Sequence, residues 1–177
     1  MMMTFDEIFE TLPTNGWLTR EEARLLHDTV KDCQGPILEV GSYHGRSTVL
    51  LASLGREVHC VDPFTGFDSD DPTGDVTKSK FLLNLSERRV SNIRLHRKKI
   101  EDWFPMFVFG FAYLDGDHTY GGTLRQIDKA IDAGVKTFCI HDYNQEGDGV
   151  AIVKAVKDRR LNVIRVVERM AHVRCPE

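Results

Sequence analysis

The chain has 177 residues, and its 23 lysines and arginines against 27 aspartates and glutamates give a formal net charge of −4. This length suits one domain with a sizeable core, in which we expect residues 1–34 to form helices ahead of the main core at 35–177. A slightly acidic chain is not expected to bind nucleic acid, and the most apolar stretch, 103–114, is too short to cross a membrane.

The cysteines are far apart in the sequence and form no C-x-x-C pair. This spacing favours a reducing compartment over a disulfide-bonded protein. The first residues contain neither the basic segment nor the apolar core of a signal peptide. We therefore expect a cytoplasmic protein that makes no membrane contact.

Two capping boxes predict helices near the N-terminus. Thr4 precedes Glu7 by three residues, and Thr19 precedes Glu22 by the same spacing, so each threonine can cap a helix whose glutamate bonds back to the cap. The second helix should continue to Val30 and stop before the Gly-Pro pair that follows.

From residue 37 onward, apolar strands alternate with helical segments. The expected strands span 37–40, 57–61, 93–98, 109–114 and 136–140. The expected helices span 46–54, 80–88, 122–133 and 149–160. Residues 66–79 are polar and predict a loop that, together with the first helices, shapes a binding pocket.

The last segment, 161–175, reads as two strands around the pair Glu168-Arg169. Strands that alternate with helices predict a parallel sheet covered on both faces, and a terminal hairpin adds an antiparallel strand. The sequence thus predicts an α/β, Rossmann-like fold with a mostly parallel seven-stranded sheet.

A glycine-containing turn after the first strand predicts a nucleoside site. Gly41 and Gly45 allow a sharp turn and a close backbone approach, and Asp62, after the next strand, can accept hydrogen bonds from ribose hydroxyls. Tyr43 and Arg46 stand where a dinucleotide fingerprint requires glycine, which argues against NAD. A turn that only packs strand against helix is the structural alternative.

Acids and histidines follow the later strands directly. One group is Asp115-Gly-Asp-His after the fourth strand, and the other is His141-Asp142 after the fifth. Since ligands bind at the carboxyl ends of parallel strands, these side chains are candidates for chemistry.

Four segments in this order carry a family resemblance: residues 39–48, 61–64, 113–120 and 140–143. Together they resemble the class I S-adenosylmethionine-dependent methyltransferases, in the group of macrocin- and mycinamicin-type sugar O-methyltransferases and cephalosporin-hydroxylase-like proteins. The resemblance covers roughly residues 35–175. It implies methyl transfer to a small hydroxylated acceptor such as a sugar.

The resemblance also implies site residues. S-adenosylmethionine would be held by Glu39, Gly41, Ser42, Tyr43, Gly45, Ser47, Asp62, Phe64, Ile100, Glu101 and Asp115. A divalent metal, Mg²⁺ or Mn²⁺, would be held by Asp115, His141 and Asp142. His118 would be the general base, with Asp115 as the second catalytic residue.

His141 departs from the family pattern, which has an acid there. A histidine ligand shifts the preference away from magnesium, or the site works without metal. A nucleoside-binding module without catalysis, a metal-dependent hydrolase and a nicotinamide-dependent oxidoreductase are the other hypotheses. The expected partner is a small-molecule acceptor, and a homo-oligomer is left open.

Overall fold

The computed structural model describes residues 3–65, 69–144 and 146–176. Its central sheet has the strand order β3-β2-β1-β4-β5-β7-β6, in which β7 runs antiparallel to both of its neighbours. The strands are β1 Ile37–Val40, β2 Val58–Val61, β3 Ile93–His96, β4 Phe111–Leu114, β5 Thr137–Ile140, β6 Asn162–Val167 and β7 Met170–Arg174. The predicted Rossmann-like fold with its terminal hairpin is confirmed.

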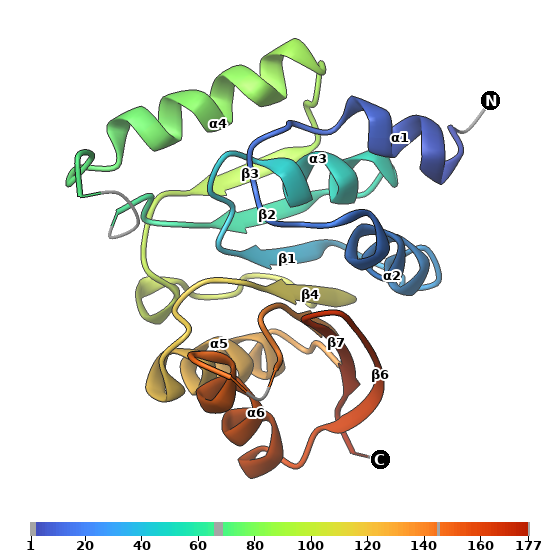
Figure 1. Cartoon of the computed structure of the whole chain (residues 1–177), viewed down its shortest axis with the longest axis vertical. Coiled ribbons are helices and arrows are strands. Elements are labelled where there is room, and N and C mark those ends of the chain that lie inside the picture. The colour runs from blue at the N-terminus through green and yellow to red at the C-terminus, as the bar shows by residue number, and fades with distance from the viewer. Residues whose placement is uncertain (1–2, 66–68, 145, 177) are drawn as a thin grey trace.

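Helices cover both faces of this sheet (Figure 1). One face carries α1 Phe5–Thr11, α2 Arg20–Val30, α3 Arg46–Ser53 and α4 Asp75–Glu87. The other carries the short 3-10 helix η1 Ile100–Asp102 with α5 Tyr120–Asp132 and α6 Gly149–Asp158. Both predicted capping boxes are present. In the part of the chain described, no helix is long and apolar enough to cross a membrane.

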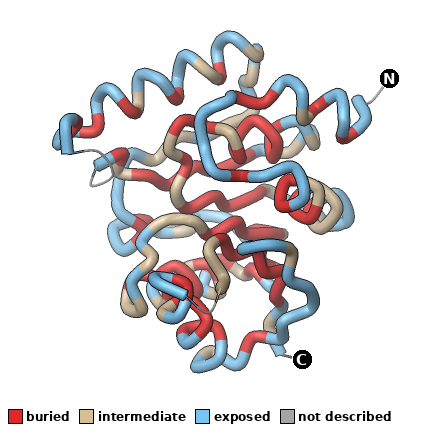
Figure 2. Tube along the Cα trace, viewed as in Figure 1, coloured by how far each residue is buried: buried red, intermediate tan, exposed pale blue. Residues whose placement is uncertain are grey.

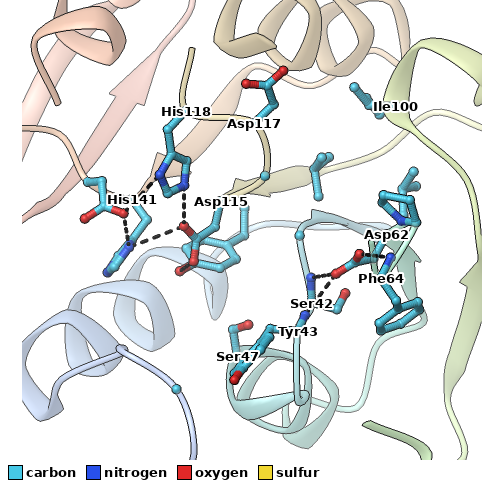
Figure 3. Close-up of a pocket in the computed structure, with 18 of the residues that line it drawn as sticks. Ser42, Tyr43, Ser47, Asp62, Phe64, Ile100, Asp115, Asp117, His118 and His141 are labelled. Carbon is cyan, nitrogen blue, oxygen red and sulfur yellow. Dashed lines mark hydrogen bonds and ion pairs between the residues drawn. The ribbon is translucent and has the colours of Figure 1, made fainter. Parts of the chain in front are cut away.

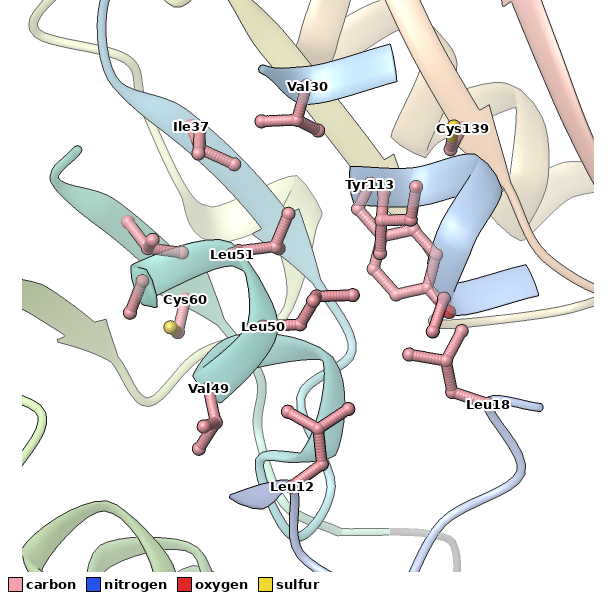
Figure 4. Packing of buried hydrophobic residues seen from close by; sticks show 14 of the residues in the cluster. Leu12, Leu18, Val30, Ile37, Val49, Leu50, Leu51, Cys60, Tyr113 and Cys139 are labelled. Carbon is pink, nitrogen blue, oxygen red and sulfur yellow. The ribbon is translucent and has the colours of Figure 1, made fainter. Parts of the chain in front are cut away.

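Two apolar cores lie on either side of the sheet because successive strand residues point to opposite faces. In β1, Ile37 packs beneath α2 and α3, whereas Leu38 and Val40 belong to the core beneath α5 and α6. The central strands are buried along their whole length (Figure 2). Figure 4 shows the first core, in which Leu50 and Leu51 of α3 pack near Tyr113 of β4.

Helix α4 begins earlier than the predicted 80–88. Its true start is Asp75, five positions upstream, and residues 66–68 of the predicted loop lie outside the described residues. The Asp71 carboxylate accepts hydrogen bonds from the amides of Val76 and Thr77, which satisfies first-turn donors from outside the helix. The prediction missed this cap because Gly74 stands at the usual capping position.

The chain leaves β1 and β4 in opposite directions, although the two strands are neighbours. β1 continues into α3 and β2, while β4 continues into α5 and β5. This arrangement opens a crevice at the carboxyl edge, where ligands bind in such sheets. Gly41 lies at this point with φ of +84°, and a Cβ built there would meet the Asp115 carbonyl oxygen at 2.1 Å.

Gly41→Ala should therefore be far more destabilising than Gly55→Ala. Gly55 has a similar φ of +75° but open space within 4 Å of the built Cβ. The left-handed backbone alone costs a residue with Cβ about 1 kcal/mol, and the clash at Gly41 should bring the loss to roughly 3 kcal/mol or more. Urea unfolding of both variants measures the difference, and equal losses would contradict the close approach.

Candidate active site

One cavity of about 820 Å³ opens between the turn after β1 and the loops after β4 and β5. Figure 3 shows how its side chains converge. Most of the predicted site residues line it: Gly41, Ser42, Tyr43, Ser47, Asp62, Phe64, Ile100, Glu101, Asp115, His118, His141 and Asp142. Glu39 and Gly45 are not part of its wall. This volume lies in the upper part of the range for ligand pockets, which suits a cofactor together with an acceptor.

Asp62 organises the glycine turn. Its Oδ2 accepts hydrogen bonds from the amides of Ser42 at 2.6 Å and Tyr43 at 2.9 Å, and its Oδ1 accepts from the amide of Phe64 at 2.6 Å. A carboxylate has about four acceptor positions, so these contacts leave room for one ligand hydroxyl. The predicted ribose acid is thus also the structural centre of the turn.

Glu39 lies beneath the turn rather than in the cavity. It is completely buried, and its carboxylate accepts hydrogen bonds from the hydroxyls of Ser42, Ser47 and Thr48. Burial raises the pKa of the Glu39 carboxyl, and the three hydroxyls oppose that shift. Its observed role is to tie the turn to the first residues of α3.

Three residues on the cavity wall have left-handed backbones that side chains rarely adopt. They are Tyr43 with φ of 47°, Phe64 with φ of 62° and Asp142 with φ of 53°. Phe64 packs on Phe81 of α4, and the ring centroid of Tyr43 lies 5.2 Å from that of Trp17. Such backbone conformations persist where surrounding contacts hold them, and they concentrate at ligand sites.

His118 lies between two carboxylates at the far end of the cavity. Its Nε2 is 3.4 Å from Oδ1 of Asp115, and its Nδ1 is 3.6 Å from Oδ2 of Asp142. Both distances exceed those of a good hydrogen bond. The sequence predicted that these residues stand at the carboxyl edge of the sheet, and the structure brings them together because β4 and β5 are adjacent.

His141 is buried beside the acid pair, Asp115 and Asp142. Its side chain is 2% exposed, and its Nδ1 is 3.4 Å from Oδ1 of Asp115 and 3.4 Å from Oδ2 of Asp142. From the hairpin turn, Arg169 places Nη1 3.0 Å from Oδ1 of Asp142. The Tyr113 hydroxyl donates a hydrogen bond of 2.9 Å to Oδ2 of Asp115. The two acids therefore have cationic and polar partners within the protein.

These contacts lower the pKa of the Asp115 carboxyl and raise the pKa values of His118 and His141. Burial alone would raise the pKa of the Asp115 carboxyl, but His141 and His118 hold it well below its usual range. The Asp115 carboxylate raises the pKa of His118 despite burial, with a further contribution from Asp142. Burial opposes protonation of His141, yet the surrounding carboxylates raise its pKa far above the usual value.

The spacing of the side chains adds His118 to the predicted metal ligands Asp115, His141 and Asp142. Ligand atoms of Asp115, His118 and Asp142 all lie within 4.8 Å of one another. The Nε2 atom of His118 is buried without a hydrogen-bond partner, as an available ligand atom would be. His141, the predicted third ligand, bonds to Glu22 through Nε2 and faces the two acids through Nδ1. One nitrogen with two carboxylates suits manganese or zinc better than magnesium.

Several residues of the site were not predicted individually, although the first helices were expected to help shape the pocket. Residues 15–18 of the α1–α2 loop line the cavity, and Arg169 reaches it from the hairpin. The capping box had identified Glu22 only as a helix cap. Trp17 offered one usable signal, since a large aromatic side chain in a loop with Pro13 and Gly16 has no helix face to join.

The comparisons with known proteins agree with this geometry. Residues 38–143 match the model of a family described as a methyltransferase domain. Because the match covers more than half of the chain, the protein belongs to this family, and it is an S-adenosylmethionine-dependent methyltransferase of class I. No curated protein matches the chain.

Solved structures with low sequence identity share the fold. The S-adenosylhomocysteine-bound methyltransferase PaMTH1 from Podospora anserina is 14% identical to this chain. Its TM-score is 0.68, over 98% of this chain and 88% of PaMTH1. The O-methyltransferase TomG from Streptomyces achromogenes, solved with S-adenosylmethionine, is 12% identical, with a TM-score of 0.65 over 97% and 89%. CalS11, a TDP-rhamnose 3'-O-methyltransferase, is 16% identical, with a TM-score of 0.59 over 98% and 92%.

Asp62→Ala should abolish most cofactor affinity. Hydrogen bonds to a charged group contribute about 1.5–3 kcal/mol each, so the dissociation constant for S-adenosylhomocysteine should rise about tenfold or more. Calorimetry measures this change. Asp75→Ala is the control, since Asp75 is an exposed acid outside this cavity. Unchanged affinity in Asp62→Ala would remove Asp62 from the cofactor site.

Proposed function

We propose that this methyltransferase transfers the methyl group to a hydroxyl of a small molecule such as a sugar, with His118 as the general base. The observation that carries this proposal is the position of His118, between Asp115 and Asp142 at the end of the cavity away from the glycine turn. A cofactor held by the turn would direct its sulfonium methyl toward that end.

Solved structures that share this fold support a hydroxylated small molecule as the acceptor. TomG is described as an O-methyltransferase, and CalS11 methylates a hydroxyl of TDP-rhamnose. Both share the fold of this chain at low sequence identity. The mixed wall of acids, arginines and aromatic side chains around the cavity is compatible with a polar acceptor that has an apolar face.

The acid pair gives His118 a defined role. With Nε2 buried toward Asp115, Nδ1 is the nitrogen that takes the proton from the acceptor hydroxyl. A positioned base of this kind contributes roughly 10²–10⁴-fold to a rate. Asp115 and Asp142 then stabilise the imidazolium that forms. The oxygen attacks the methyl carbon, and S-adenosylhomocysteine leaves with the electron pair of the broken carbon–sulfur bond.

Metal assistance is a second candidate, favoured by the spacing of the donor atoms in Asp115, His118 and Asp142. A divalent ion held there would lower the pKa of the acceptor hydroxyl and orient it. The same histidine cannot serve as ligand and base together, so the two roles are experimentally separable.

His118→Gln should cut turnover by roughly 10²–10⁴-fold while leaving S-adenosylmethionine affinity unchanged. The assay follows transfer of a labelled methyl group to TDP-rhamnose and to a panel of free sugars and small alcohols. His96→Gln is the matched control, because His96 is a half-buried histidine outside the cavity. Cofactor binding by the wild type without transfer to any hydroxyl would favour a binding module instead.

Asp142→Asn should move the acid limb of the pH–activity profile to lower pH. The Asp142 charge helps to raise the pKa of His118, and a base must lose its proton before it can act. Without that charge, His118 deprotonates at lower pH and activity appears earlier as pH rises. A profile of kcat/KM against pH checks this, and an unmoved or upward-shifted limb would contradict His118 as the base.

Removal of metal by a chelator tests whether His118 acts as a general base or as a metal ligand. If His118 is the base, enzyme treated with EDTA should keep its turnover, because His141 and Arg169 already provide positive charge beside the acids. Inactivation by EDTA with recovery on adding Mn²⁺ would instead assign His118 to a metal.

A further inference from the structure

Two helices of this chain begin with the same capping box but in different surroundings. In α1, the Glu7 carboxylate accepts a hydrogen bond from the Thr4 amide at 2.7 Å and is exposed. In α2, the Glu22 carboxylate accepts one from the Thr19 amide at 3.1 Å, but its side chain is only 1% exposed. Capping does not require burial, and burying a charge is costly without further partners. Glu22 therefore has a role that Glu7 lacks.

The further partners of Glu22 belong to the active site. Its Oε2 lies 3.2 Å from Nε2 of His141, whose side chain is 2% exposed. Its Oε1 accepts a hydrogen bond of 3.1 Å from the amide of Arg169, in the turn between β6 and β7. One carboxylate thus connects the start of α2 to the residue after β5 and to the hairpin.

His141 extends this connection to the acids. With Nε2 fixed by Glu22, its ring presents Nδ1 at 3.4 Å from both Asp115 and Asp142. The Arg169 guanidinium holds the other oxygen of Asp142 at 3.0 Å. Both routes from Glu22, through the ring and through the hairpin turn, end at the carboxylates that flank His118.

We propose that Glu22 is a positioning residue, which acts through His141 to set the two acids around His118. This inference rests on the proposed function, in which His118 is the base. This position requires a carboxylate, because its two oxygens accept hydrogen bonds from three N–H groups. These belong to Thr19, His141 and Arg169. A glutamine of the same shape offers one acceptor oxygen instead of two, so it cannot keep all three contacts.

The test is the NMR signals of the histidine ring nitrogens in the protein saturated with S-adenosylhomocysteine. Glu22→Gln should shift the ring signals of both His141 and His118. Glu7→Gln, the matched control, makes the same substitution at the corresponding capping residue of α1 and should leave both rings unchanged. A folded Glu22→Gln protein with an unchanged His118 signal would overturn the proposal. If that variant does not fold, Glu22→Asp keeps the charge while withdrawing it from His141, and the same criterion applies.

A double variant shows whether the effect passes through His141. In a His141→Asn background, Glu22→Gln should shift the His118 ring signal less than it does in the wild-type background, since only the route through Arg169 is left. An equal shift in both backgrounds would contradict the route. These signals do not depend on turnover. Absence of methyl transfer in the wild type would therefore count against the proposed function alone, whereas an unmoved His118 ring counts against Glu22 alone.

Discussion

The close approach of two chain segments at the middle of the sheet determines the rest of the site. β1 and β4 are parallel neighbours whose chains leave in opposite directions, and Gly41 passes so near the Asp115 carbonyl that no Cβ fits between them. This contact puts the turn that begins at Gly41 and the loop that begins at Asp115 on opposite sides of one crevice. Cofactor and catalytic groups can therefore face each other across it.

Each side of the crevice is held by two buried or half-buried acids with many partners. On the cofactor side, Asp62 fixes the turn through backbone amides, and Glu39 supports it from below through hydroxyls. On the opposite side, Asp115 and Asp142 are balanced by His141 and Arg169. In both places the protein supplies the polar partners that buried charges require, so the site is preorganised before any ligand arrives.

The sequence predicted those parts of the protein that depend on local pattern. Apolar strands, glycine turns and capping boxes indicated the sheet, and the rule that ligands bind at strand ends brought Asp62, Asp115 and His118 together correctly. It could not predict the contact between Glu22 and His141, which lie 119 residues apart. The early start of α4 was missed for a related reason, because Asp71 caps that helix from outside the usual position.

The most direct test is a crystal structure with bound S-adenosylhomocysteine. Our account predicts the ribose at Asp62, the adenine between Phe64 and Ile100, and the sulfur directed across the crevice toward His118, with space for one acceptor hydroxyl between them. A sulfur that points away from His118 would contradict the account, as would a cofactor bound outside the crevice between Gly41 and Asp115.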